Sequence, residues 1–115
     1  MVTKKTIKVP IYDYRVIIVV ADTLKEAYKI YPDIDYEGKA CVAEYTNYSI
    51  IAIPSYQPEI IAHECVHLKN CIWKYIGYKP EANNDEVDAY LVGYLFDQVS
   101  KVVAKHNLIQ RRLHT

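Results

Sequence analysis

The first half of the chain shows the hydrophobic pattern of strands interrupted by one short helix. Residues 11–22, IYDYRVIIVVAD, are rich in β-branched and aromatic side chains, and the centre of this run is apolar at every position. Such a run predicts a strand that is covered on both faces and lies inside a sheet. In residues 23–31 the apolar positions recur at three and four, after Asp22 or Thr23 as a cap and before Pro32. This pattern predicts a short amphipathic helix lying on the sheet.

Two more strand-like runs follow a polar segment. Residues 32–39 have the Pro, Asp and Gly content of a turn, whereas residues 41–45 (CVAEY) and 48–54 (YSIIAIP) are again rich in β-branched and aromatic side chains. Thr46 and Asn47 separate the two runs and suit a tight turn. The pattern therefore predicts a strand hairpin that completes the sheet.

The second half of the chain changes to a helical period. Pro58 suits the first position of a helix and Gly77 suits its C-terminal cap, so a helix is expected between them. A second helix is expected from about Asp85 to near His106. The predicted order is β-α-β-β-α-α, with no linker or repeat. We therefore expect one α+β domain over residues 1–115, with a small mixed sheet packed on the first of these two helices.

The composition argues against several classes of function. Lys plus Arg and Asp plus Glu both number 14, so the chain has no net charge, and no basic run is interleaved with aromatic residues. Nucleic acid is therefore not an expected ligand. The apolar run at residues 16–21 is too short to cross a bilayer or to form the core of a signal peptide. Three cysteines without paired ligand spacing suggest buried, reduced thiols, so we expect a cytoplasmic protein that does not bind membranes.

Tyrosine is frequent, with 12 residues against one Phe and one Trp. A tyrosine buries its ring and still presents a hydroxyl group. This set of residues therefore suits a core with polar tips, a recognition surface, or both. The sequence leaves these alternatives open.

The most specific motif is HECVH at residues 63–67, inside the first of the two C-terminal helices. Four residues correspond to about 40° around a helix, so His63 and His67 share one face, with Glu64 beside them. Two imidazoles at this spacing can bind one tetrahedral Zn²⁺, and the glutamate is free to take a proton from metal-bound water. The apolar stripe that we expect to pack on the sheet lies nearly opposite the histidines and comprises Ile61, Cys65, Leu68, Ile72 and Ile76.

The second C-terminal helix has a polar face of its own. Glu86, Tyr90, Gly93 and Asp97 share this face, apart from the apolar stripe of the same helix. A glycine inside a helix costs about 1 kcal/mol relative to alanine, so Gly93 predicts a close approach to the histidine helix. Tyr90 and Asp97 are then candidates to fix a histidine tautomer or to steady a ligating carboxylate.

The succession SIIAIPSYQPEIIAHECVH, followed by NNDEVDAYLVGYL, resembles the small zincin-like metallopeptidases encoded by bacteriophages, and more distantly the ImmA/IrrE and SprT-like groups. The resemblance covers residues 49–95, with a strand before the AHExxH helix and a glutamate in the next helix. It implies a minimal zincin-like domain in which His63, His67 and Glu86 hold zinc and Glu64 is the general base. Glu86 follows His67 by 19 residues, and the connecting loop is long enough to bring it back to the histidines.

The resemblance also implies a peptide or protein substrate that adds as a strand to residues 48–54, the segment before the motif. Asp85, Asp88 and Glu81 compete with Glu86 for the position of third metal ligand. Catalysis further requires a group that steadies the oxyanion, and the candidates are Tyr90, Tyr94, Tyr45 and Tyr56.

Two hypotheses of function follow. The first is a zinc-dependent metallopeptidase of the cytoplasm, which is the host cytoplasm if the chain is phage-encoded. The alternative is a catalytically inactive zincin-like protein that binds a protein partner through its tyrosine-rich surface. The sequence makes no prediction of the oligomeric state.

Overall fold

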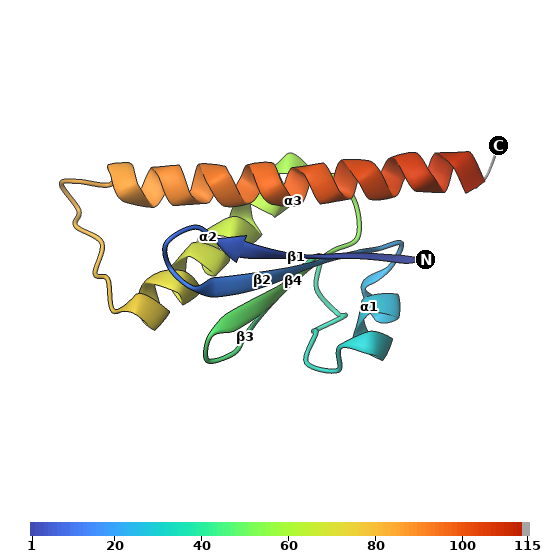
Figure 1. Ribbon diagram of the computed structural model, residues 1–115. Coiled ribbons are helices and arrows are strands. Elements are labelled where there is room, and N and C mark those ends of the chain that lie inside the picture. Colours follow the sequence, from blue (N-terminus) through green and yellow to red (C-terminus); the bar gives the residue numbers. More distant parts are fainter. Residues whose placement is uncertain (114–115) are drawn as a thin grey trace.

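The computed structural model describes residues 1–113, which form a four-stranded mixed sheet with helices on both faces (Figure 1). The strands are ordered β1-β2-β4-β3 across the sheet. The β1–β2 and β3–β4 pairs are antiparallel, and the central β2–β4 pair is parallel. The strand bounds are β1 Val2–Val9, β2 Tyr14–Ala21, β3 Cys41–Glu44 and β4 Tyr48–Ile53. The predicted small mixed sheet in an α+β fold is therefore confirmed.

The apolar run of residues 11–22 forms β2, which is an interior strand as expected. Its alternate side chains enter two cores on opposite faces of the sheet. Val16, Ile18 and Val20 pack with α2 (Pro58–Ile76) and α3 (Glu86–Leu113), while Val19 and Ala21 pack on the other face. Burial on both faces explains why this strand is apolar at successive positions.

The expected order β-α-β-β-α-α omits one strand at its beginning. This strand, β1, precedes β2 and pairs with it along its whole length. β1 is an edge strand with three lysines on its exposed positions, and only Ile7 and Val9 are buried. Lysines on an exposed edge also discourage pairing with other chains. The predicted order is therefore wrong at its beginning, although the order of the remaining elements is correct.

The three helices form two separate layers. α1 (Leu24–Ile30), capped by Thr23 as predicted, covers one face of the sheet through Leu24 and Ala27. α2 and α3 cover the other face, α2 over β3 and β4, and α3 over β1 and β2 (Figure 1). α2 begins at Pro58 and ends before Gly77, whose φ of 75° is the left-handed conformation that favours glycine.

α3 extends to Leu113, well beyond the predicted end near His106. Residues 107–113 contain neither Gly nor Pro, so nothing in the sequence stops the helix. His106 is buried, and its ring nitrogens make hydrogen bonds with Thr3 Oγ1 at 2.7 Å and Asp22 Oδ1 at 3.0 Å. These bonds fasten the last third of α3 to β1 and to the residue that follows β2. Among residues 1–113, no helix has both the length and the apolar character needed to cross a membrane.

Candidate active site

The HECVH motif occupies the first half of α2, where the helix passes over the edge of the sheet. The predicted apolar stripe packs in the core, with Ile61, Cys65, Leu68 and Ile72 fully buried and only Ile76, at the helix end, exposed. The two histidines are exposed on the face nearly opposite this stripe. Because the stripe packs in the core, the two histidines point away from the core, toward solvent.

The imidazoles of His63 and His67 converge on one point. Their Nε2 atoms are 3.2 Å apart, and the ring planes are inclined by 74°. Two nitrogens bound to one zinc ion at 2.0–2.1 Å in tetrahedral geometry are separated by about 3.3 Å. The observed separation fits this value, so the two side chains already have the spacing of a shared metal.

Within residues 1–113, Glu64 is the only acidic residue that is buried. It is 8% exposed, and it makes no hydrogen bond or ion pair with any residue in the part of the chain that the structure describes. Its carboxylate oxygens are not among the fully enclosed polar atoms of residues 1–113, so they keep contact with solvent and are accessible to a group from outside the chain.

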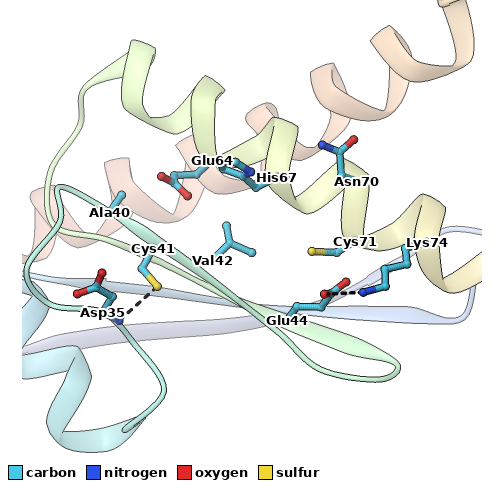
Figure 2. Close-up of a pocket in the computed structure, with 10 residues that line it drawn as sticks. All are labelled: Asp35, Ala40, Cys41, Val42, Glu44, Glu64, His67, Asn70, Cys71 and Lys74. Atoms are coloured by element: carbon cyan, nitrogen blue, oxygen red, sulfur yellow. Dashed lines mark hydrogen bonds and ion pairs between the residues drawn. The ribbon is translucent and has the colours of Figure 1, made fainter.

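A cavity of about 480 Å³ lies between α2 and β3, and we call it the β3–α2 cavity. Figure 2 shows Glu64 and His67 on the α2 wall, with Ala40, Cys41 and Val42 on the wall opposite. The ion pair between Lys74 and Glu44, at 3.3 Å, closes one end, and Asp35 lies toward the other end. Asn70 and Cys71 complete the lining.

A second cavity, of about 350 Å³, adjoins the first around Glu64 and is called the Lys39 cavity. It is lined by Lys39, Ala40, Glu59, Ile60, His63 and Glu64. Glu64 and Ala40 contribute to both cavities. The buried carboxylate therefore lies at the junction of two hollows that follow the same flank of α2.

The three cysteine thiols are free, as expected. Burial raises the pKa of Cys65 to about 12, and it also raises the pKa of Cys41 and Cys71, which line the β3–α2 cavity. A thiol with a raised pKa is neutral at physiological pH and a poor nucleophile. These side chains therefore act as small apolar groups in the cavity wall.

The acidic residues of α3 lie on the other flank of α2. Asp88 accepts hydrogen bonds from Lys69 Nζ at 2.9 Å and from the Trp73 indole N–H at 2.6 Å. By the helical phase of about 100° per residue, Lys69 projects from α2 about 120° or more away from both histidines, and Trp73 projects about 80° from His63 and 120° from His67. Asp88, a competing ligand in the sequence, is thus engaged in a structural contact away from the histidines.

The structure does not bring Glu86 to His63 and His67. Glu86 is exposed and precedes Asp88 by two residues, which places the two side chains on roughly opposite sides of α3. Within residues 1–113, no three side chains of His, Cys, Asp or Glu are close enough together to hold a metal ion. Glu86 as third ligand therefore stays a prediction, and so do Asp85 and Glu81, which are exposed in the preceding loop and turn.

The expected supporting residues are also distant from the histidines. Tyr90 and Tyr94 line an apolar groove with the β1–β2 turn, and Asp97 pairs with Lys101 at 2.9 Å on the surface of α3. Gly93 has no neighbour within 4 Å of a side chain built there, so the predicted close approach of two helices is wrong. The position of Gly93 has no structural explanation.

The other two oxyanion candidates have their own environments. Tyr45 donates its hydroxyl hydrogen to Asp33 and stacks on Tyr48, and the bond to Asp33 raises its pKa to about 12. Tyr56 is 47% exposed in the loop before α2. Neither residue is among those that line the β3–α2 cavity or the Lys39 cavity.

The strand available for pairing with a peptide is not the one expected. β4, which contains most of residues 48–54, pairs with β2 on one side and with β3 on the other. Both of its edges are therefore occupied, and a peptide cannot add to it. β3 is the outer strand on this side of the sheet, and its outer edge borders the β3–α2 cavity.

Comparison of the chain with protein-family models, with curated proteins and with solved structures finds no match. The assignment of function therefore depends on the geometry of the site. The sequence did not identify Asp35, Cys41 and Val42 as part of that site, because only the place of β3 at the sheet edge brings them to α2.

Proposed function

We propose that this protein is a zinc-dependent hydrolase of peptide bonds, with His63 and His67 as metal ligands and Glu64 as general base. The observation that carries the proposal is the pair of Nε2 atoms 3.2 Å apart, with the buried, unpaired carboxylate of Glu64 in the next position of the helix. Two converging imidazoles and an unpaired carboxylate form a suitable donor set for zinc chemistry.

Zinc held by His63 and His67 would supply a bound water with a pKa near 7 and a Lewis acid for the substrate carbonyl. Glu64 is free to accept the proton of that water, because no other residue described in the structure occupies its oxygens. The same carboxyl group then delivers the proton to the leaving amine. The position of Glu64 on α2 directly after His63, together with its burial, limits its conformations and keeps it beside the two histidines.

The proposed substrate is an extended peptide bound along the outer edge of β3. Main-chain hydrogen bonds to an exposed strand give affinity, and pockets for alternate side chains give specificity. The β3–α2 cavity and the Lys39 cavity adjoin this edge on either side of Ala40 and Glu64. A peptide in this groove passes the base and both histidines.

We retain Glu86 as the proposed third ligand on the basis of its spacing from the histidines. In this proposal, the first turn of α3 would have to leave its contacts with Lys69 and Trp73 for Glu86 to reach the metal. The loop of residues 77–85 is exposed or half-buried and connects the two helices, so movement of this turn does not disturb the core stripe of α2.

A direct test compares the purified protein with its Glu64→Gln variant. Metal analysis after zinc addition is expected to give about one zinc per chain in both proteins, and only the wild type is expected to hydrolyse a fluorescent casein substrate. Glu26→Gln makes the same chemical change on α1, on the opposite face of the sheet, and should retain activity. Equal activity of wild type and Glu64→Gln would overturn the mechanism.

A second candidate function, binding of a protein partner without catalysis, is favoured by an exposed apolar surface formed by the β1–β2 turn and α3. Ile11 is 90% exposed in the β1–β2 turn, and Tyr90 on α3 is 75% exposed. Between them, Tyr12, Tyr94 and Val87 line a groove of about 270 Å³. Failure to bind zinc even at saturating metal would favour this function over the hydrolase.

A further inference from the structure

The β3–α2 cavity combines an apolar lining, the floor of the cavity, with a carboxylate at one end. This apolar lining consists of Ala40 and Val42 on the β3 side and Cys71 on the α2 side, and Asp35 lies toward the end away from the Glu44–Lys74 pair (Figure 2). We infer that this cavity binds the side chain of a lysine or arginine next to the scissile bond of the substrate. The inference rests on the proposed hydrolase function and names the class of peptide that it cleaves.

The floor of the cavity suits the alkyl portion of such a side chain. Val42 packs toward the main core on the α2 side of the sheet, and Cys71 faces it from α2. Lysine and arginine place their methylene groups on apolar surface while the charged group reaches a polar one. The cavity presents these two kinds of surface in sequence along its length.

Of the two carboxylates at the ends of the cavity, Glu44 and Asp35, only Glu44 has a basic partner in the described part of the chain. Glu44 is neutralised by Lys74, with the Nζ and Oε1 atoms 3.3 Å apart. Asp35 has no ion pair with any described residue, and its Oδ1 accepts one hydrogen bond, from the backbone N–H of Glu37 at 3.0 Å. This bond holds one oxygen of the carboxylate and leaves the second oxygen available for a cation.

Glu64 also borders this cavity. The residue as a whole is 8% exposed, and its carboxylate has no hydrogen-bond or ion-pair partner within residues 1–113. Zinc held by the neighbouring histidines would compensate the charge of Glu64. Asp35 stands on the opposite wall and remains uncompensated, so it is the residue that determines the preference for a cation.

The experiment measures cleavage by the zinc-loaded protein of a peptide mixture produced with a protease that cuts after aromatic residues, which leaves lysine, arginine, aspartate and glutamate inside the peptides, followed by mass spectrometry. Lysine and arginine are expected next to the cut about tenfold more often than aspartate and glutamate, because the Asp35 carboxylate attracts a cationic side chain and repels an anionic one. Asp35→Asn keeps the oxygen that accepts from Glu37 N–H and should abolish this preference. Asp13→Asn, an equal change at an exposed carboxylate of the β1–β2 turn, should retain it.

The outcomes separate this inference from the proposed function. Zinc-dependent cleavage without a preference, or with a preference that Asp35→Asn does not change, would overturn the inference and leave the hydrolase intact. Absence of all cleavage would overturn the hydrolase. The preference of the cavity for a cationic side chain, which is the part of the inference that does not require cleavage, is then decided by NMR titration with alanine pentapeptides carrying a central lysine or norleucine.

In this titration, the backbone amide signals of Val42 and Cys71 are followed in the wild type and in Asp35→Asn. Selective shifts with the lysine peptide, lost in Asp35→Asn and kept in Asp13→Asn, support the inference. Equal shifts with both peptides, or none, overturn it. An exposed ion pair contributes little free energy, so the lysine peptide is expected to bind about fivefold more tightly than its norleucine counterpart.

Discussion

Trp73 donates its indole N–H to Asp88 at 2.6 Å, which joins the C-terminal half of α2 to the first turn of α3. The Trp73 ring also contacts Tyr78 and Tyr12, with ring centroids 4.7 and 5.7 Å away. Trp73 is the single tryptophan of the chain. Its fluorescence therefore reports on the junction that must open if Glu86 moves to the metal.

We predict that zinc binding changes the emission of Trp73, because ligation by Glu86 withdraws the first turn of α3 from Lys69 and Trp73. In Glu86→Gln the emission should not respond to zinc, and the affinity for zinc should fall by about tenfold or more, since one of three protein ligands is lost. Fluorescence titration with zinc measures both quantities. Unchanged affinity in Glu86→Gln, with no response of Trp73 in either protein, would show that Glu86 is not a ligand.

Asp88→Ala should lower the free energy of unfolding by about 2 kcal/mol, because it leaves the Lys69 ammonium nearly buried without its partner. The side chains of Lys69 and Asp88 are only 11% and 22% exposed. Asp97→Ala removes the exposed pair with Lys101 and should change the stability by no more than about 0.5 kcal/mol. Urea unfolding of the two variants provides the comparison, and equal losses would contradict this account.

The contribution of Asp88 should also depend on pH. Burial opposes ionisation of this carboxyl group, but hydrogen bonds from Lys69 and Trp73 outweigh burial and hold its pKa below the ordinary value. A pKa that is lower in the folded than in the unfolded state stabilises the fold above the unfolded value, about 3.9, and this stabilisation is lost as pH falls through the folded pKa.

The difference in unfolding free energy between wild type and Asp88→Asn is therefore expected to be constant above about pH 5 and to shrink below about pH 4. Urea unfolding at several pH values between 7 and 3 tests this dependence. Asp97→Asn is the control at an exposed ion pair. A difference that is as large at pH 3 as at pH 7 would contradict the proposed role of the carboxylate.

The sequence predicted most elements because their signals are local. Pro58 and Gly77 mark the two ends of α2, and Thr23 caps α1. β1 was not predicted because it has more lysines than buried residues. Only Ile7 and Val9 show the alternation of apolar and polar positions that is typical of a strand. An edge strand with one solvated face needs few apolar residues, and it becomes recognisable only when its partner is known.

The candidate site was predictable only in part. The spacing of His63 and His67 along one helix determines their convergence, and the structure shows it. The position of Glu86 depends instead on how α3 docks on α2, and that is decided by Asp88 and Trp73 across the interface. Similarly, the exposed strand beside the site depends on the strand order, which places β3 outside β4.

Ile11 should be replaceable with a gain in stability. It has a φ of 64°, a left-handed conformation that costs a β-branched residue about 1–2 kcal/mol, and its side chain is 90% exposed. Ile11→Asn is expected to raise the free energy of unfolding by about 1 kcal/mol, because asparagine tolerates this conformation. Ile30→Asn, at an exposed isoleucine at the end of α1, should bring no gain in the same thermal or urea measurement.

The parallel pairing of β2 with β4 divides the sheet into two hairpins, β1–β2 and β3–β4, which meet along one seam. Each hairpin closes through a short turn, whereas the seam joins strands that are separated by α1, the segment after it and β3. Closing this longer loop costs more chain entropy before it yields contacts. Folding should accordingly proceed by early formation of the hairpins and late closure of the seam, so that substitutions at Ile18 or Ile51 chiefly accelerate unfolding.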